Sequence, residues 1–135
     1  MSYWINMAKK YASIDVGLKR IGCALSLAAG IVNPQEAIIR KNRNQASSDV
    51  DKFLKEWEID TLVIGYPKAS EDMMKRVDHF SKLLEFDGEI VFQNENLSSQ
   101  EAKEMTMGIV KHKRDGRLDS IAAKIILERF LEGRD

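Results

Sequence analysis

Residues 11–26 (YASIDVGLKRIGCALS) constrain the fold of this chain more than any other stretch. Two short apolar runs, residues 11–16 and 21–27, have the length and composition of β-strands, and a Gly-Leu-Lys-Arg turn joins them. Gly17 supplies the backbone freedom that a tight hairpin turn requires. The stretch therefore predicts a β-hairpin near the start of the chain.

Asp15 lies inside the first apolar run, where side chains are expected to be buried. Burying an ionised carboxylate without a partner is costly, because the charge loses its hydration. Two interpretations are open. Asp15 either caps the turn at Gly17, as Asp does in many ordinary hairpins, or it holds a cation.

The composition is that of one soluble domain. Of the 135 residues, we expect 11–135 to form the domain and 1–10, which show no hydrophobic period, to form an N-terminal extension. The single cysteine, Cys23, fits a reducing cytoplasm and is expected to be a buried, inert thiol. No apolar stretch approaches the ~18 residues of a membrane span, so we expect a cytoplasmic protein with no membrane partner.

Hydrophobic periodicity predicts an α/β fold with a mixed five-stranded sheet flanked by helices. After the hairpin, a third strand is expected in residues 31–40, followed by a polar loop at 42–48 and a helix that begins near Ser47 or Ser48. Two further strands are expected at residues 61–65 and 89–93, with a helix carrying Met73, Val77, Phe80 and Leu84 between them. Two last helices are expected from Ser98 and from about Leu118 to Leu131.

Two more carboxylates occupy positions typical of a site. Glu95 directly follows a strand, and ligands of open α/β sheets gather at the carboxyl ends of strands. Asp119 precedes Ala122, Ala123, Ile126 and Phe130 at helical spacing, so it heads the stripe expected to face the sheet. The alternatives are an exposed loop Glu and a first-turn Asp that the helix dipole favours.

Asp15, Glu95 and Asp119 can converge on one point, because they come from a strand centre, a strand end and a helix start. Two carboxylates ~4 Å apart repel by about 4 kcal/mol at an effective dielectric of ~20. They would stay together with a cation or a shared proton between them. Oxygen ligands without His or Cys suit Mg²⁺ or Mn²⁺ and argue against zinc.

Basic residues form clusters even though Lys plus Arg and Asp plus Glu both number 21, which gives zero net charge. Lys19 and Arg20 in the hairpin turn are candidates to bind backbone phosphate. So is a loop before the last helix, with Lys111, Lys113, Arg114 and Arg117. A third cluster is Arg40, Lys41 and Arg43. The alternative for the clusters is an ordinary solvated loop, and a non-specific nucleic-acid binder is usually more basic than this chain.

Four motifs resemble the successive signatures of the YqgF/RuvX family: DVGLKRIGCALS at 15–26, VIGYP at 63–67, NENLSS at 94–99 and LDSIAA at 118–123. This family comprises small bacterial proteins with a ribonuclease H-like fold, described as Holliday junction resolvases or pre-16S rRNA nucleases. The resemblance implies a Mg²⁺- or Mn²⁺-dependent nuclease in which Asp15, Glu95 and Asp119 bind the metal and carry catalysis. The implied substrate is structured RNA, foremost the 5′ end of pre-16S rRNA, with branched DNA as the alternative.

The chain departs from the family pattern beside one of the three acids. The family usually has Asp-Glu-Arg where this chain has Asn94-Glu95-Asn96, and Ser-Asp where Ser26-Leu27 stand. The missing Arg is a potential phosphate clamp. A nucleic-acid-binding module with a decayed active site is therefore a further alternative. A phosphate-loop ATPase is the least favoured, because its two domains would not fit in 135 residues. The sequence leaves the oligomeric state open.

Overall fold

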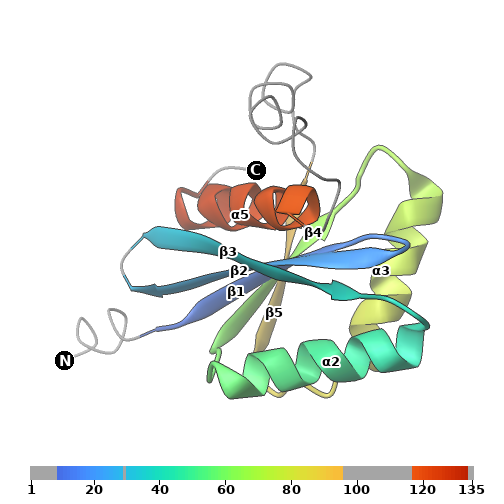
Figure 1. Ribbon diagram of the computed structural model, residues 1–135. Helices are drawn as coiled ribbons and strands as arrows, with labels where there is room; N and C mark the ends of the chain where they lie inside the picture. The colour runs from blue at the N-terminus through green and yellow to red at the C-terminus, as the bar shows by residue number, and fades with distance from the viewer. Residues whose placement is uncertain (1–8, 29, 96–116, 134–135) are drawn as a thin grey trace.

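The computed structural model describes residues 9–28, 30–95 and 117–133, with the backbone alone for 117–119. Figure 1 shows the elements of these residues. The strands are β1 (Tyr11–Val16), β2 (Arg20–Ala28), β3 (Ile31–Ile39), β4 (Thr61–Tyr66) and β5 (Glu89–Asn94). The helices are α2 (Arg43–Glu56), α3 (Glu71–Leu83) and α5 (Arg117–Leu131).

The strands form one mixed sheet in the order β3-β2-β1-β4-β5, which confirms the predicted five-stranded architecture. β2 is antiparallel to both β1 and β3, whereas β1, β4 and β5 are mutually parallel. The carboxyl ends of β1, β4 and β5 therefore lie at the same edge of the sheet.

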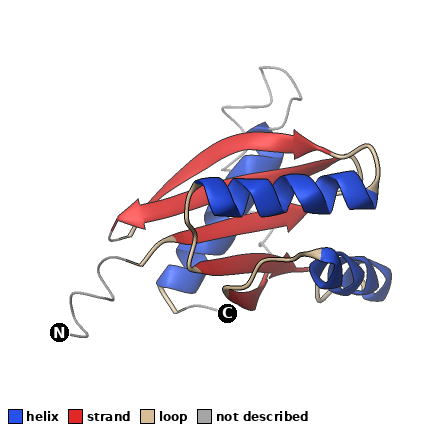
Figure 2. Cartoon of the chain, turned by 90° about the horizontal axis from the view of Figure 1, so that it is seen from below, coloured by secondary structure: helices blue, strands red, loops and turns tan. Residues whose placement is uncertain are grey.

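Helices cover both faces of the sheet. α2 and α3 lie on one face and α5 lies on the other, as Figures 1 and 2 show from two directions. On the α2/α3 face the core includes Ile14, Leu54 and Phe80, whereas Val63 and Leu127 pack in the core under α5. Because β4 is covered on both faces, its residues Thr61 to Gly65 are all buried, as expected for an inner parallel strand.

The predicted hairpin between β1 and β2 is confirmed. Val16 pairs with Ile21, and the Gly17 N–H donates to the Arg20 carbonyl at 3.1 Å. A Cβ at Gly17 would lie 2.5 Å from that carbonyl oxygen, closer than atoms can approach. The turn therefore requires glycine at this position.

Helix α2 begins at Arg43, so the predicted loop at 42–48 and the helix start near Ser47 or Ser48 were wrong. Asn42 caps the helix, since its side chain accepts the Gln45 N–H at 2.8 Å. The Gln45 side chain accepts the Asn42 N–H in return at 3.3 Å, which completes a capping box. The first turn is polar because it lies at the molecular edge, and its capping pattern of Asn and Gln three residues apart was overlooked.

Part of the sequence prediction falls outside the described residues. This holds for residues 1–8 of the N-terminal extension and for the whole of the helix expected from Ser98. Lys10, by contrast, is fastened to the sheet: its N–H donates to Asp60 Oδ2 at 2.8 Å and its carbonyl accepts the Asp60 N–H at 2.9 Å.

In the described part of the chain, no helix is long and apolar enough to cross a membrane.

Two buried serines fasten α5 to the sheet. Ser13 of β1 donates its hydroxyl to the Ala123 carbonyl at 2.6 Å, and the Cys23 N–H of β2 donates to Ser120 Oγ at 3.3 Å. Ser13 and Ser120 are 0% and 1% exposed, so water does not compete for these bonds. At the other end of α5, the Phe130 ring packs 6.0 Å from the Tyr11 ring. The helix thus starts over the end of β1 and runs back toward the start of that strand.

The predicted sheet-facing stripe of α5 is largely confirmed. Ala123 and Ile126 are buried against the sheet and Phe130 packs beside them. Ala122 is only half-buried, and Leu127 joins the buried set in its place.

Ser120→Ala is expected to lower the free energy of unfolding by about 1–3 kcal/mol, because the buried Cys23 N–H loses an acceptor. Ser13→Ala should cost less, about 1 kcal/mol, because the Ala123 carbonyl lies inside a helix and has an ordinary helical donor as well. Urea unfolding measures both losses. Ser47→Ala is the matched control, since the buried Ser47 hydroxyl bonds only within α2, to the Asn44 carbonyl at 3.1 Å. An equal loss for Ser47→Ala and Ser120→Ala would contradict this role for Ser120.

Candidate metal-binding and catalytic site

Asp15 lies near the carboxyl end of β1, paired with Gly22 of β2. Side chains alternate along a strand, so Asp15 shares a face with Ser13, whose hydroxyl bonds to α5. The intervening Ile14 belongs to the opposite, apolar face. Asp15 is half-buried on the α5 face. The carboxylate that interrupts the apolar run is therefore directed away from the larger core.

Glu95 is held directly after β5, where its N–H donates to the Tyr66 carbonyl at 3.2 Å. Its side chain lies over Gly65 of β4: a Cβ built at Gly65 would be 2.9 Å from Glu95 Oε2 and 2.5 Å from Ile126 Cδ1. Gly65 follows Ile64, which pairs with Ile14, so Gly65 lies beside Asp15. The missing side chain at Gly65 thus gives the Glu95 carboxylate room next to Asp15, under α5.

Asp119 lies in the first turn of α5, and its side chain is outside the described residues. The next residue, Ser120, accepts from the N–H of Cys23, which is adjacent to the Gly22 that pairs with Asp15. The backbone of Asp119 is therefore at the same edge of the sheet as Asp15 and Glu95. The three acids that the sequence singled out come from elements that meet there.

The donor set of this site suits a hard divalent cation. Asp15 and Glu95 offer carboxylate oxygens on one face of the sheet, and Mg²⁺ and Mn²⁺ prefer such oxygens. Among the described side chains, which exclude that of Asp119, no three His, Cys, Asp or Glu residues form a metal-binding group. A site of three carboxylates would therefore need Asp119 of α5 in addition to Asp15 of β1 and Glu95, which follows β5.

The residues expected to bind nucleic acid are described only in part. Lys19 is exposed in the turn after β1, and Arg20 is half-buried at the start of β2. Arg117 begins α5, with its side chain outside the described residues. The loop with Lys111, Lys113 and Arg114 lies outside them entirely.

Sequence reasoning missed the structural roles of three residues at or near the site: Gly65, Ser120 and Arg40. Gly65 had been interpreted only as part of a strand end, although a glycine beside a buried strand often marks a close approach. Ser120 sits next to an acid in LDSIAA, but its bond to Cys23 joins residues 97 positions apart. The Arg40 guanidinium donates to the Gly17 carbonyl at 2.9 Å and supports the hairpin turn. No local sequence pattern predicts the contact of Ser120 with Cys23 or that of Arg40 with Gly17.

Cys23 takes no part in the chemistry of the site. Burial raises the pKa of its thiol to about 12, so the thiol stays protonated and unreactive at neutral pH. This confirms the buried, inert cysteine that the sequence predicts.

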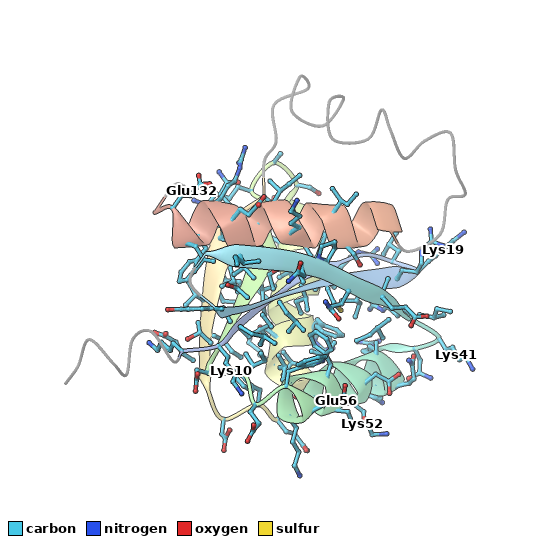
Figure 3. All side chains as sticks on the ribbon, turned by 60° about the vertical axis from the view of Figure 1, so that its left-hand side comes forward. Lys10, Lys19, Lys41, Lys52, Glu56 and Glu132 are labelled. Atoms are coloured by element: carbon cyan, nitrogen blue, oxygen red, sulfur yellow. The ribbon has the colours of Figure 1, made fainter. Side chains whose placement is uncertain are left out.

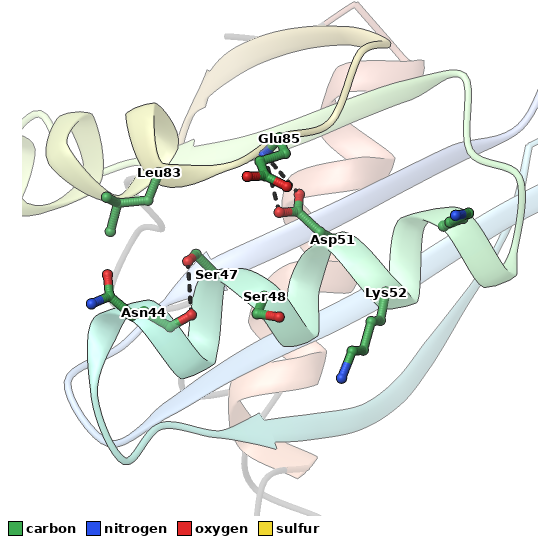
Figure 4. Close-up of a pocket in the computed structure, with 8 residues that line it drawn as sticks. Asn44, Ser47, Ser48, Asp51, Lys52, Leu83 and Glu85 are labelled. Atoms are coloured by element: carbon green, nitrogen blue, oxygen red, sulfur yellow. Dashed lines mark hydrogen bonds between the residues drawn. The ribbon is translucent and has the colours of Figure 1, made fainter.

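A pocket of about 420 Å³ lies away from Asp15 and Glu95, between α2 and the end of α3 (Figure 4). Its lining includes Asp51, Lys52 and Glu85. The Asp51 carboxylate accepts the Glu85 N–H at 3.0 Å and so secures the chain after α3. Burial raises the pKa of Asp51, and that hydrogen bond partly offsets the effect. The Asp51 carboxylate thus has a structural partner and lies on the face of the sheet opposite α5.

Solved structures with this fold include two of the fowlpox virus Holliday junction resolvase. The resolvase alone superposes with a TM-score of 0.56 at 14% identity, covering 92% of this chain and 99% of the other. Its complex with Holliday junction DNA gives a TM-score of 0.59 at 11% identity, covering 92% and 97%. At such low identity the likeness concerns the fold alone, which is ribonuclease H-like as predicted.

Close sequence relatives cover nearly the whole chain. A protein of Sulfurovum sp. (strain NBC37-1) named "Putative pre-16S rRNA nuclease" is 62% identical over 125 residues, 90% of this chain and 98% of its own length. Proteins of the same name from Sulfurimonas denitrificans and Campylobacter lari are 51% and 49% identical, each over 90% of this chain and 96% of the relative. The family described as "RuvX: Holliday junction resolvase" matches residues 9–133. The chain therefore belongs to the RuvX family.

Proposed function

We propose that this chain is a divalent-metal-dependent nuclease whose single domain, residues 11–135, hydrolyses phosphodiester bonds in the 5′ region of pre-16S rRNA. The observation that carries the proposal is the Glu95 carboxylate lying over the bare Gly65, beside Asp15. The name of the relatives supports the RNA substrate, because they are up to 62% identical and match over nearly their full length.

In this proposal Asp15, Glu95 and Asp119 hold Mg²⁺ or Mn²⁺. When bound, the ion supplies Lewis-acid stabilisation of the charge that develops on the phosphate oxygens. Gly65 leaves space for the Glu95 carboxylate, and Ser120 fixes the start of the helix that carries Asp119. Lys19 and Arg20 are proposed to contact the phosphate backbone next to the cut, because their turn follows Asp15 directly.

Cleavage of four-way DNA junctions is the second candidate, favoured by the description of the matching family. A four-way junction presents two equivalent strands, so its resolution favours a symmetric dimer. Light scattering at micromolar concentration separates the candidates in part, since a monomer would count against junction resolution. Parallel cleavage assays on precursor RNA and on a four-way junction decide between them.

Asp15→Asn is expected to fold and to lose cleavage activity, because the amide keeps the volume of the carboxylate but not its charge. In EDTA its free energy of unfolding should equal or exceed that of wild type, since repulsion between carboxylates is relieved. Cleavage of a 5′-extended 16S precursor RNA with Mg²⁺ or Mn²⁺, and urea unfolding in EDTA, measure the two effects.

Asp87→Asn is the matched control for charge, because Asp87 is exposed in the connection before β5. It should retain wild-type cleavage. If Asp15→Asn also cleaves at the wild-type rate, Asp15 is not part of a catalytic metal site. If no protein cleaves RNA or DNA while all still bind it, the chain is a binding module with a decayed site.

Gly65→Ala should weaken the stabilisation of the protein by metal, because its Cβ would lie 2.9 Å from Glu95 Oε2 and would displace the end of that side chain. For wild type, an ion at 100 times its dissociation constant should add about 2.7 kcal/mol to the free energy of unfolding. Thermal unfolding with and without Mn²⁺ measures the difference.

The double variant Gly65→Ala/Ile126→Val separates the site from packing. Valine lacks the Cδ1 atom that a Gly65 Cβ would meet at 2.5 Å, so the double variant should regain stability in EDTA. It should still gain less stability with Mn²⁺ than wild type does, because the close contact with Glu95 remains. If Mn²⁺ stabilises the double variant as much as it stabilises wild type, Glu95 does not bind the ion at this place.

A further inference from the structure

Positive charge is concentrated in one part of the sequence. Between Asp15 and Asp49 there are five basic residues and one acidic residue, Glu36. The basic residues are Lys19, Arg20, Arg40, Lys41 and Arg43. Because the whole chain has zero net charge, the rest of the chain is net acidic. A neutral protein of this kind can still attract a polyanion to one region of its surface.

The fold brings the two halves of this basic stretch together. The Arg40 N–H donates to the Lys19 carbonyl at 2.9 Å, and the Arg40 guanidinium donates to the Gly17 carbonyl at 2.9 Å. The same guanidinium lies 5.7 Å from the centre of the Phe80 ring of α3. Arg40 therefore holds the turn after β1 against the connection between β3 and α2.

Lys19, Lys41 and Arg43 form the exposed part of this region, which we call the basic corner. Lys19 and Lys41 lie on the same side of the molecule, far from Lys10, in Figure 3. Among the described residues, no carboxylate is within ion-pair distance of these three cations. Arg43 is hydrogen-bonded at 2.8 Å to Nε2 of His79, which is a ring nitrogen and not a carboxylate.

The basic corner is close to the candidate site but separate from it. Three residues of chain lead from Asp15 to Leu18 in the turn, so the two residues are at most about 10 Å apart along the backbone. Cations beside this turn are placed to meet phosphates that flank the cut.

We propose that Lys41 and Arg43 extend the surface of Lys19 and bind the phosphate backbone of the nucleic-acid substrate beside the cleavage site. This inference rests on the proposed function, because it requires a nucleic-acid substrate. Point charges on flexible side chains contact phosphates without reading bases, so the contribution is independent of sequence. Arg40 contributes by holding the corner against the turn that follows Asp15.

The test compares wild type with Lys41→Gln/Arg43→Gln and with the matched control Lys52→Gln/Lys55→Gln. The control also removes two positive charges, but from exposed positions farther along α2. The probe is an RNA hairpin with a single-stranded 5′ extension, in two unrelated sequences. Binding is followed by fluorescence anisotropy across a salt series, in EDTA so that cleavage does not intervene.

The corner variant should lose affinity equally for both RNAs. Its slope of log affinity against log salt should be shallower by about 1.4–1.8, since each lost phosphate contact removes about 0.7–0.9. The slope of the control should match wild type. Single-turnover cleavage at saturating RNA should be unchanged in the control variant, because it touches neither the carboxylates nor the basic corner. Lys41→Gln alone, which leaves the Arg43–His79 contact in place, should show about half the change in slope.

Three outcomes would overturn the proposal. If all proteins have the same slope while wild type still cleaves RNA, the basic corner has no role and the proposed function stands. If the control loses as much slope as the corner variant, general charge and not this corner attracts RNA. If wild type does not bind either RNA, the basic corner and the proposed function both fail.

Discussion

The docking of α5 on the sheet is the interaction on which the candidate site depends. The helix meets β1 through the Ser13 hydroxyl and β2 through Ser120, and both bonds are shielded from water. These contacts determine where the first turn of α5 lies, and with it the backbone of Asp119. Without α5, the face that carries Asp15 and Glu95 would be open to solvent and would lack the element proposed to supply the third acid.

The parallel strands contribute the second constraint, which is the close approach of the Glu95 side chain to the backbone of β4 at Gly65. Glu95 reaches toward Asp15 across β4, the strand between them, at the position where Gly65 has no side chain. The same gap accommodates the end of Ile126 from α5. The missing Cβ at Gly65 therefore serves both the packing of α5 and the placement of the Glu95 carboxylate.

Much of the fold could be predicted from the sequence, because burial imposes clear patterns. The apolar runs that became β1 and β4 were placed within one residue of their ends, and Asp15 stood out because it broke such a run. The start of α2 was misplaced because the capping pair Asn42 and Gln45 is polar and resembles a loop. The clamp at Arg40 and the bond of Ser120 to Cys23 join residues distant in sequence, so only the folded structure reveals them.

The bond between Ser13 and Ala123 joins residues 110 positions apart, which has a consequence for biosynthesis. Contacts of such long range form slowly, because closing the long intervening loop costs conformational entropy before the contact stabilises the chain. The hairpin with Asp15 precedes α5 in the chain, so it leaves the ribosome first. A nascent chain therefore carries Asp15 before the helix that completes the candidate site exists, so the site could assemble only once α5 has been translated.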